Sequence, residues 1–136
     1  MPSETSLTGL PRRHMLVLLA TLTACAAGSS PSRTVQDFYR ALDEGRISDA
    51  MKLLTGIPVG MESKIQVALG VFSESLKAEG GLASVDVASE DVNGEGAKVT
   101  YKLSTRNPGD KPKVGNGKTQ TQALQKIDKQ WRIVLR

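Results

Sequence analysis

The chain has 136 residues, of which 39% are hydrophobic and 24% charged, and its formal net charge is +4. This size and composition are typical of one small globular domain, and so mild a charge does not indicate a particular partner. The single histidine, His14, and the single cysteine, Cys25, both lie near the N-terminus. The rest of the sequence therefore lacks the residues of Ser-His or Cys-His nucleophile pairs and of zinc sites built on these side chains, and it has no phosphate-binding P-loop.

The first residues have the layout of a secretory signal. Arg12 and Arg13 precede a short apolar run over residues 15–22, which ends in small residues. The run is about half as long as the ~20 apolar residues of a membrane-spanning helix. We therefore predict that residues 1–24 form a signal peptide. The Arg12-Arg13 pair also leaves open export by the twin-arginine route.

Four residues at the end of this run resemble the lipobox of bacterial lipoproteins, Leu-x-Ala-Cys. They are Leu22, Thr23, Ala24 and Cys25. The resemblance implies cleavage before Cys25, diacylglycerol on its sulfur and an acylated amine, so that lipid anchors the protein to the cell envelope. Ala26, rather than Asp, follows the cysteine. By resemblance to Gram-negative lipoproteins, this implies an outer-membrane location facing the periplasm.

A lipidated Cys25 and a flexible tether are predicted over residues 25–33, and one domain over residues 34–136. In the domain, Thr34 and Asp37 have the spacing of a capping box, and Gly45 is placed to end the helix that follows. Apolar residues recur on one face of this helix: Val35, Phe38, Tyr39 and Leu42.

Two further helices are predicted. Ser48 is placed to cap a short helix in which Leu54 faces inward, and Thr55 with Gly56 ends that helix. The next covers residues 61–79, where apolar residues keep helical spacing over four turns until Gly80 and Gly81.

After these glycines the hydrophobic period changes to two, which is typical of half-buried strands. Strands are predicted over residues 82–89, 97–104, 118–127 and 131–135. Asn93-Gly94 indicates a hairpin between the first two, and residues 128–130 a tight turn before the last. Three helices followed by a four-stranded meander predict an α+β fold, with the helices covering one face of an antiparallel sheet.

The order of these signals resembles that of a known superfamily. Residues 32–45 read SRTVQDFYRALDEG, followed by Ala50. This is similar to the V-x-x-F-Y-x-A-L-x-x-G-x-x-x-x-A opening of nuclear-transport-factor-2-like domains. Residues 80–82 and 129–133 resemble small lipoproteins of that superfamily whose function is unknown. The resemblance implies a cone-like, cystatin-like fold with a curved sheet of about four strands. Some enzymes of the superfamily use Asp, His and Tyr in the cone, but the predicted domain has no histidine, so no catalytic residue is carried over.

Six residues could line a pocket in this cone or form its packed core: Phe38, Tyr39, Met51, Phe72, Tyr101 and Trp131. Tyr39 and Tyr101 are favoured as wall residues because a buried hydroxyl needs a partner. Asp37, Asp86 and Asp91 are the carboxylates weighed as a general base. The structural alternative is helix capping for Asp37, an exposed strand face for Asp86 and a turn for Asp91. No Asp or Glu is predicted at an inward position.

These observations favour a lipid-anchored envelope protein with a non-catalytic binding or assembly domain, without metal or cofactor. Its partner would be the membrane, through the lipid, together with a small apolar ligand or a protein. Few aromatic residues and no basic stripe argue against nucleic acid. Two alternatives stay open. One is a small isomerase- or dehydratase-like enzyme acting on an apolar substrate in the cone. The other is a homodimeric module that pairs through the outer face of the sheet, which a large apolar patch there would favour.

Overall fold

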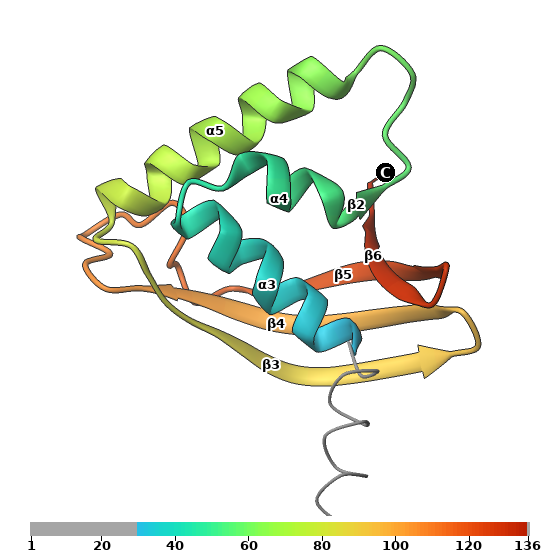
Figure 1. The fold of residues 1–136 in the computed structure, drawn as a ribbon. Coiled ribbons are helices and arrows are strands. Elements are labelled where there is room, and N and C mark those ends of the chain that lie inside the picture. Colours follow the sequence, from blue (N-terminus) through green and yellow to red (C-terminus); the bar gives the residue numbers. More distant parts are fainter. Residues whose placement is uncertain (1–29, 136) are drawn as a thin grey trace, which may run out of the picture.

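The computed structural model describes residues 30–135, so the predicted cleavage and lipidation sites at Leu22–Cys25 lie outside it. Figure 1 shows its elements. In chain order they are α3 (Pro31–Asp43), α4 (Ile47–Lys52), β2 (Leu54–Thr55), α5 (Glu62–Ala78), β3 (Leu82–Asn93), β4 (Gly96–Thr105), β5 (Thr119–Ile127) and β6 (Gln130–Val134). Within residues 30–135, no helix combines the length and apolar character needed to cross a bilayer.

Helix α3 begins at Pro31, earlier than predicted, and Ser30 caps it instead of Thr34. The Ser30 hydroxyl accepts a hydrogen bond from the Arg33 N–H at 3.1 Å. Proline suits the first helical position because the missing N–H would have no helical partner there. Asp37 does not cap the helix as predicted, but forms an exposed ion pair with Arg33 at 3.7 Å. The predicted tether thus overlaps the first turn of α3.

The end of α3 is the predicted one. Gly45 has a φ of +75°, a left-handed conformation that glycine adopts without a steric penalty. Its N–H donates to the Leu42 carbonyl at 3.2 Å, and the Arg46 N–H donates to the Ala41 carbonyl at 2.8 Å. These two bonds form a Schellman motif, which satisfies carbonyls that the helix would otherwise leave without partners.

Helix α4 and the segment after it differ from the prediction. Arg46 occupies the N-cap position without a side-chain capping bond, so the predicted cap at Ser48 is wrong. Leu54 was predicted to be helical but belongs to strand β2. The preceding Leu53 carbonyl accepts the Ile133 N–H at 2.7 Å, which ties this segment to the sheet.

The sheet has five strands in the order β2-β6-β5-β4-β3. Strand β2 is parallel to β6, with Leu54 opposite Ile133, and the other neighbours are antiparallel. The predicted α+β fold is therefore confirmed, with a mixed sheet of five strands in place of an antiparallel one of about four. A strand as short as β2 has no periodicity by which sequence analysis can detect it.

Both predicted hairpin turns are confirmed. Gly94, with a φ of +65°, and Glu95 connect β3 to β4. Asp128 and Lys129 connect β5 to β6 with φ angles of 51° and 68°, the left-handed pair of a type I′ turn.

The helices form two layers on one side of the sheet. Helix α3 packs on the strands, and α5 packs against α3 and α4, so it lies farther from the sheet than α3 (Figure 1). The buried core lies mainly between α3 and the inner face of the sheet. Its largest fully buried side chains are Tyr101, Leu42, Leu76, Leu103, Val35 and Val99.

Candidate functional site

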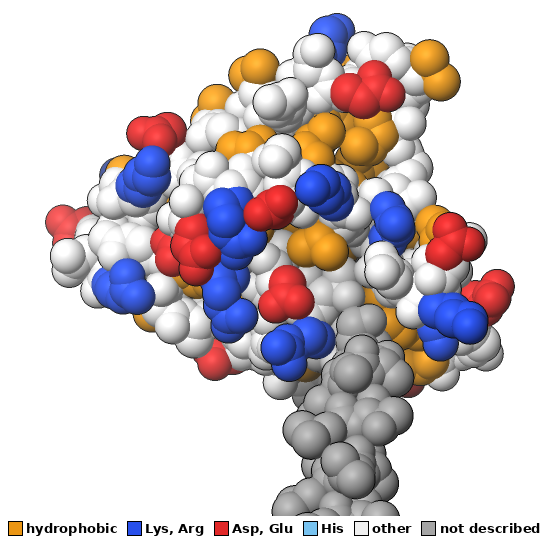
Figure 2. Space-filling model, viewed as in Figure 1, with side chains coloured by type: hydrophobic (Ala, Val, Ile, Leu, Met, Phe, Trp, Pro, Cys, Tyr) orange, Lys and Arg blue, Asp and Glu red, His pale blue; other side chains and the backbone are white. Residues whose placement is uncertain are grey.

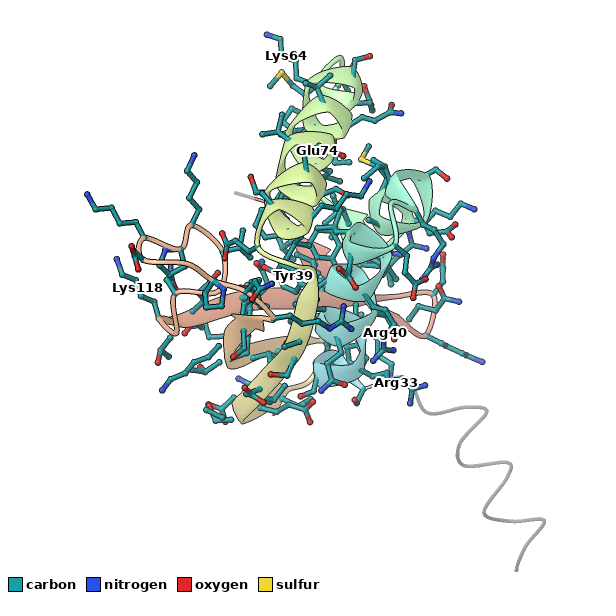
Figure 3. The ribbon with its side chains drawn as sticks, turned by 90° about the vertical axis from the view of Figure 1, so that its left-hand side faces the viewer. Arg33, Tyr39, Arg40, Lys64, Glu74 and Lys118 are labelled. Atoms are coloured by element: carbon teal, nitrogen blue, oxygen red, sulfur yellow. The ribbon has the colours of Figure 1, made fainter. Side chains whose placement is uncertain are left out.

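Two tyrosine hydroxyls meet inside the domain. Tyr39 comes from α3 (Figure 3) and Tyr101 from β4, and their Oη atoms are 2.6 Å apart. Tyr39 is 9% exposed and Tyr101 only 1%. Burial raises the pKa of both hydroxyls, and the Tyr101 hydroxyl raises the pKa of Tyr39 further. Both therefore stay protonated at neutral pH, and one hydroxyl donates a hydrogen bond to the other.

The structure brings four of the six predicted pocket residues into one aromatic cluster. The Tyr39 ring centroid lies 5.2 Å from that of Phe38, 5.8 Å from Phe72 and 5.6 Å from Tyr101. These distances are typical of rings in contact. The half-buried Met51 packs against the same hydrophobic core. This arrangement is that of a packed interior.

Trp131, the sixth predicted residue, closes the core from β6. It is 6% exposed, and the Lys126 Nζ lies 5.7 Å from its ring centroid. Its carbonyl accepts a hydrogen bond from the Thr34 hydroxyl at 3.4 Å, which links β6 to α3. The predicted inward position of Trp131 in its strand is confirmed.

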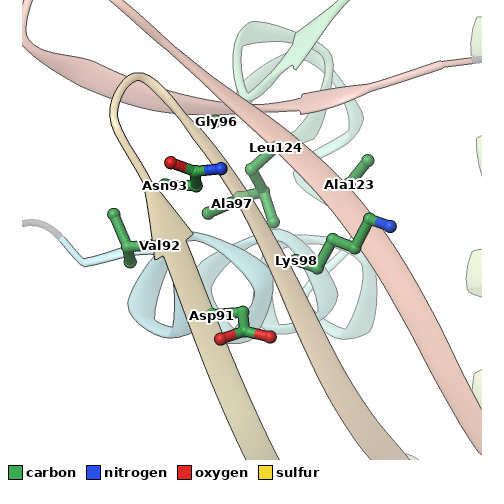
Figure 4. A pocket seen from close by; sticks show the side chains of 8 residues that line it. All are labelled: Asp91, Val92, Asn93, Gly96, Ala97, Lys98, Ala123 and Leu124. Carbon is green, nitrogen blue, oxygen red and sulfur yellow. The ribbon is translucent and has the colours of Figure 1, made fainter.

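A surface hollow of about 620 Å³ lies over β3, β4 and β5, near the β3–β4 turn (Figure 4). Its lining includes the charged side chains of Asp91 and Lys98, which face each other in the register of the two strands. Asp91 is therefore part of β3, and its predicted place in the turn is wrong. None of the six predicted pocket residues lines this hollow.

A second hollow, of about 340 Å³, lies between α3 and α4 and is rich in charge. Arg46 binds Asp49 at 2.9 Å and Glu44 at 2.8 Å. The hydrogen bonds that Arg46 donates to these two carboxylates raise its pKa, and the bond from Arg46 lowers the pKa of Asp49. Because the charges are paired and exposed, this network contributes little to stability, and it holds no carboxylate whose pKa is raised toward that of a general base.

Sequence analysis missed a buried carboxylate, and its prediction that no Asp or Glu faces inward is wrong. Glu79 follows α5 and is only 7% exposed. Its carboxylate accepts hydrogen bonds from the Thr105 hydroxyl at 3.0 Å and from the N–H groups of Lys113, Val114 and Gly115, each at 2.9 Å. Burial would raise its pKa, but these bonds outweigh that effect and hold the pKa below its ordinary value.

The geometry makes Glu79 an anchor for the loop between β4 and β5. A carboxylate that stays ionised and is fully hydrogen-bonded is a poor proton acceptor. One sequence signal could have revealed that Glu79 is buried and bonded. An acidic residue at the C-terminal end of a helix opposes the helix dipole, so Glu79 just before Gly80 requires a compensating contact.

Comparison with known proteins identifies the fold. No protein-family model and no curated protein matches the chain. Among solved structures, the crystal structure of a "putative NTF2-like transpeptidase" from Campylobacter jejuni matches with a TM-score of 0.62 and 16% sequence identity, over 79% of this chain and 100% of that one. The chain has the nuclear-transport-factor-2-like fold. At this identity the match extends to the fold alone.

In this nuclear-transport-factor-2-like domain, the other candidate carboxylates lie at the surface. Asp86 is exposed on β3 and accepts a hydrogen bond from the Ser84 hydroxyl at 3.0 Å. Asp37 and Asp91 have the salt-bridge and cross-strand positions described above. Among residues 30–135, no three acidic, histidine or cysteine side chains are close enough to hold a metal ion.

Proposed function

We propose that this protein is a lipoprotein of the bacterial cell envelope whose domain binds or assembles with a partner and catalyses no reaction. The packed interior supports the second half of the proposal. Tyr39 and Tyr101 meet between α3 and β4, where a substrate would bind in the cone. A substrate there would have to break their hydrogen bond and separate rings that contact each other.

The sequence at Leu22–Cys25 supports the anchor. If Cys25 carries lipid, Ser30, the cap of α3, is the fifth residue after it. A fully extended segment of that length spans at most ~18 Å. The domain would therefore lie close to the membrane surface, and Ala26 after the cysteine favours the outer membrane.

The anchor is tested by expressing the full chain with Cys25→Ser and fractionating the cells. We expect the variant to leave the membrane fraction and to lose its lipid mass, while the matched variant Ala27→Ser keeps both. Ala26→Asp should move the lipidated protein to the inner membrane. A Cys25→Ser protein that stays in the membrane with its lipid would contradict the proposal.

The absence of catalysis is tested on the purified mature protein. We expect no turnover of esterase or isomerase substrates. Turnover that disappears in Tyr101→Phe or Glu79→Gln, while both variants remain folded, would support the enzyme alternative instead.

A further inference from the structure

Helix α5 carries hydrophobic side chains that point away from the domain. Val67 is 67% exposed and Val71 is 62% exposed, and they lie one helical turn apart. Its inward face carries a separate set of residues that pack on the core: Ile65, Leu69, Phe72 and Leu76. Figure 2 shows hydrophobic atoms at the surface over α5, whereas charged side chains dominate over α3 and α4. A helix that is apolar on two faces normally has a partner on each.

The two valines belong to a regular pattern, which we call the α5 stripe: Lys64, Val67, Val71, Glu74 and Ala78. Successive members are three and four residues apart, the spacing that aligns side chains along the contact line of two packed helices. All five are exposed. Figure 3 shows Lys64 near the start of α5, projecting away from the domain, and Glu74 farther along the helix.

We propose that two copies of this chain associate through the α5 stripe, antiparallel, about a two-fold axis level with Leu69. Lys64 and Glu74 are equally far from Leu69 along the helix, and so are Val67 and Val71. Rotation about this axis therefore places Val67 opposite the partner's Val71. It also places Lys64 opposite the partner's Glu74. A two-fold interface requires this kind of self-complementarity.

Charge selects this arrangement over the others. Parallel helices in register would bring each Lys64 against the partner's Lys64, and each Glu74 against the partner's Glu74. The antiparallel arrangement turns both contacts into attractive pairs that flank an apolar centre. Charges beside an apolar seam determine orientation and register in this way.

The local structure permits the contact. Glu74 binds Lys77 of its own helix at 3.2 Å, but both side chains are more than half exposed, so this pair is weak and can exchange. No atom lies within 4 Å of the position that a Cβ on Gly70 would occupy, so the backbone beside the valines is accessible. Two short helices bury less than the ~1,200 Å² of a stable interface. The association is therefore weak and depends on concentration.

The outer face of the sheet is a poorer surface for self-association. Its residues on β4 alternate with the buried ones and are polar or charged, including Lys98, Thr100 and Lys102. Lys98 and Lys102 are already opposite Asp91 and Asp86 on β3. The apolar patch that would have favoured pairing through the sheet lies instead on α5. The proposed contact lies within the folded domain, so it does not require lipid on Cys25.

Cysteine cross-linking tests the register. Full-length Val67→Cys and Val71→Cys chains with different tags are expressed together, and the cells are oxidised with copper-phenanthroline. We expect a disulfide-linked heterodimer. The matched control combines Gln66→Cys with Lys77→Cys, which are exposed on α5 but off the stripe. Chains with only Cys25 measure the background. Cross-linking no greater than in the control would overturn the proposal.

Charge reversal in the same cross-linking chains tests the orientation. Lys64→Glu or Glu74→Lys in both copies places like charges opposite each other and should reduce the heterodimer by about fivefold. The double variant, Lys64→Glu with Glu74→Lys, should restore it. Lys102→Glu makes the same change on the sheet and should have no effect. Failure of the double variant to restore cross-linking would overturn the antiparallel arrangement.

Discussion

At the residue scale, Glu79 shows how a carboxylate can be buried and still remain ionised. Three backbone N–H groups and one hydroxyl surround it. Hydrogen bonds to the charged form replace the water that burial removes, so the pKa falls although burial alone would raise it. The contribution of Glu79 to stability is therefore present above the unfolded-state pKa of about 4.3. It is lost as the pH falls through the lower pKa of the folded state.

Glu79→Gln should lower the free energy of unfolding by about 1–3 kcal/mol at pH 7, because buried N–H donors then face an amide that can also donate. The difference from wild type should narrow below pH ~4.3. Urea denaturation at pH 7 and in acid measures both effects. Glu95→Gln, on an exposed residue of the β3–β4 turn, is the control. An equal loss at both pH values would contradict the assigned role of the charge.

The two tyrosines form a second polar contact in the core, and a double-mutant cycle tests it. Tyr39→Phe or Tyr101→Phe alone leaves one buried hydroxyl without its partner and should cost about 1–3 kcal/mol of unfolding free energy. The double variant removes both hydroxyls and should cost less than the sum of the single losses. Additive losses would mean that the hydroxyls do not depend on each other.

Trp131 stabilises the fold through the volume that its side chain fills in the core. Because it is 6% exposed, Trp131→Ala should lower the free energy of unfolding by about 3–5 kcal/mol. The variant lacks the only tryptophan, so denaturation is followed by circular dichroism. Gln130→Ala, at an exposed neighbouring position, should leave the midpoint almost unchanged. An unchanged midpoint for Trp131→Ala would place the ring outside the cooperative core.

At the scale of elements, the features that follow a regular hydrophobic period or a turn motif were predictable from the sequence. The inward face of α3, the alternation of β4 and the Asn93-Gly94 hairpin are confirmed. Two local errors have a common cause. The start of α3 and the strand β2 depend on a few specific hydrogen bonds, including those from the Arg33 N–H to the Ser30 hydroxyl and from the Ile133 N–H to the Leu53 carbonyl. Several residues near each site can make such bonds, and only the folded chain selects one.

The loop between β4 and β5 packs closely against Thr105 at Gly115. A Cβ there would lie 2.6 Å from the Thr105 backbone nitrogen and would also meet the Thr105 side chain. Gly115→Ala should therefore cost about 1–3 kcal/mol of unfolding free energy, because it displaces the loop from Glu79. Gly70→Ala, in the open interior of α5, should instead stabilise by about 0.5–1 kcal/mol. Thermal denaturation of both variants separates the two cases, and a neutral Gly115→Ala would contradict the close packing.

At the scale of the whole molecule, the fold was predictable and its buried polar contacts were not. Helical and strand periods, with the superfamily resemblance, were enough to predict helices on a curved sheet. The Tyr39–Tyr101 bond joins α3 to β4, and the Glu79 contacts join α5 to a loop. Each pairs residues far apart in the sequence, and no local pattern specifies such a pair. The same holds for the α5 stripe, which is recognisable as unpartnered only once the inward face of the helix is known.

The first turn of α3 is tied to the rest of the domain, and truncation tests how much this turn contributes to stability. Ser30 caps α3, and the Ser32 N–H and hydroxyl donate to Glu90 on β3 at 2.9 and 2.6 Å. A chain that begins at Ser30 should keep the thermal midpoint of the mature protein within about 2 °C. A chain that begins at Val35 loses the cap and the link to β3, and should lose about 2–3 kcal/mol of unfolding free energy. Ser30→Ala in the longer chain isolates the cap and should account for about 1 kcal/mol. Equal stability of the two truncated chains would show that the first turn of α3 contributes nothing to the fold.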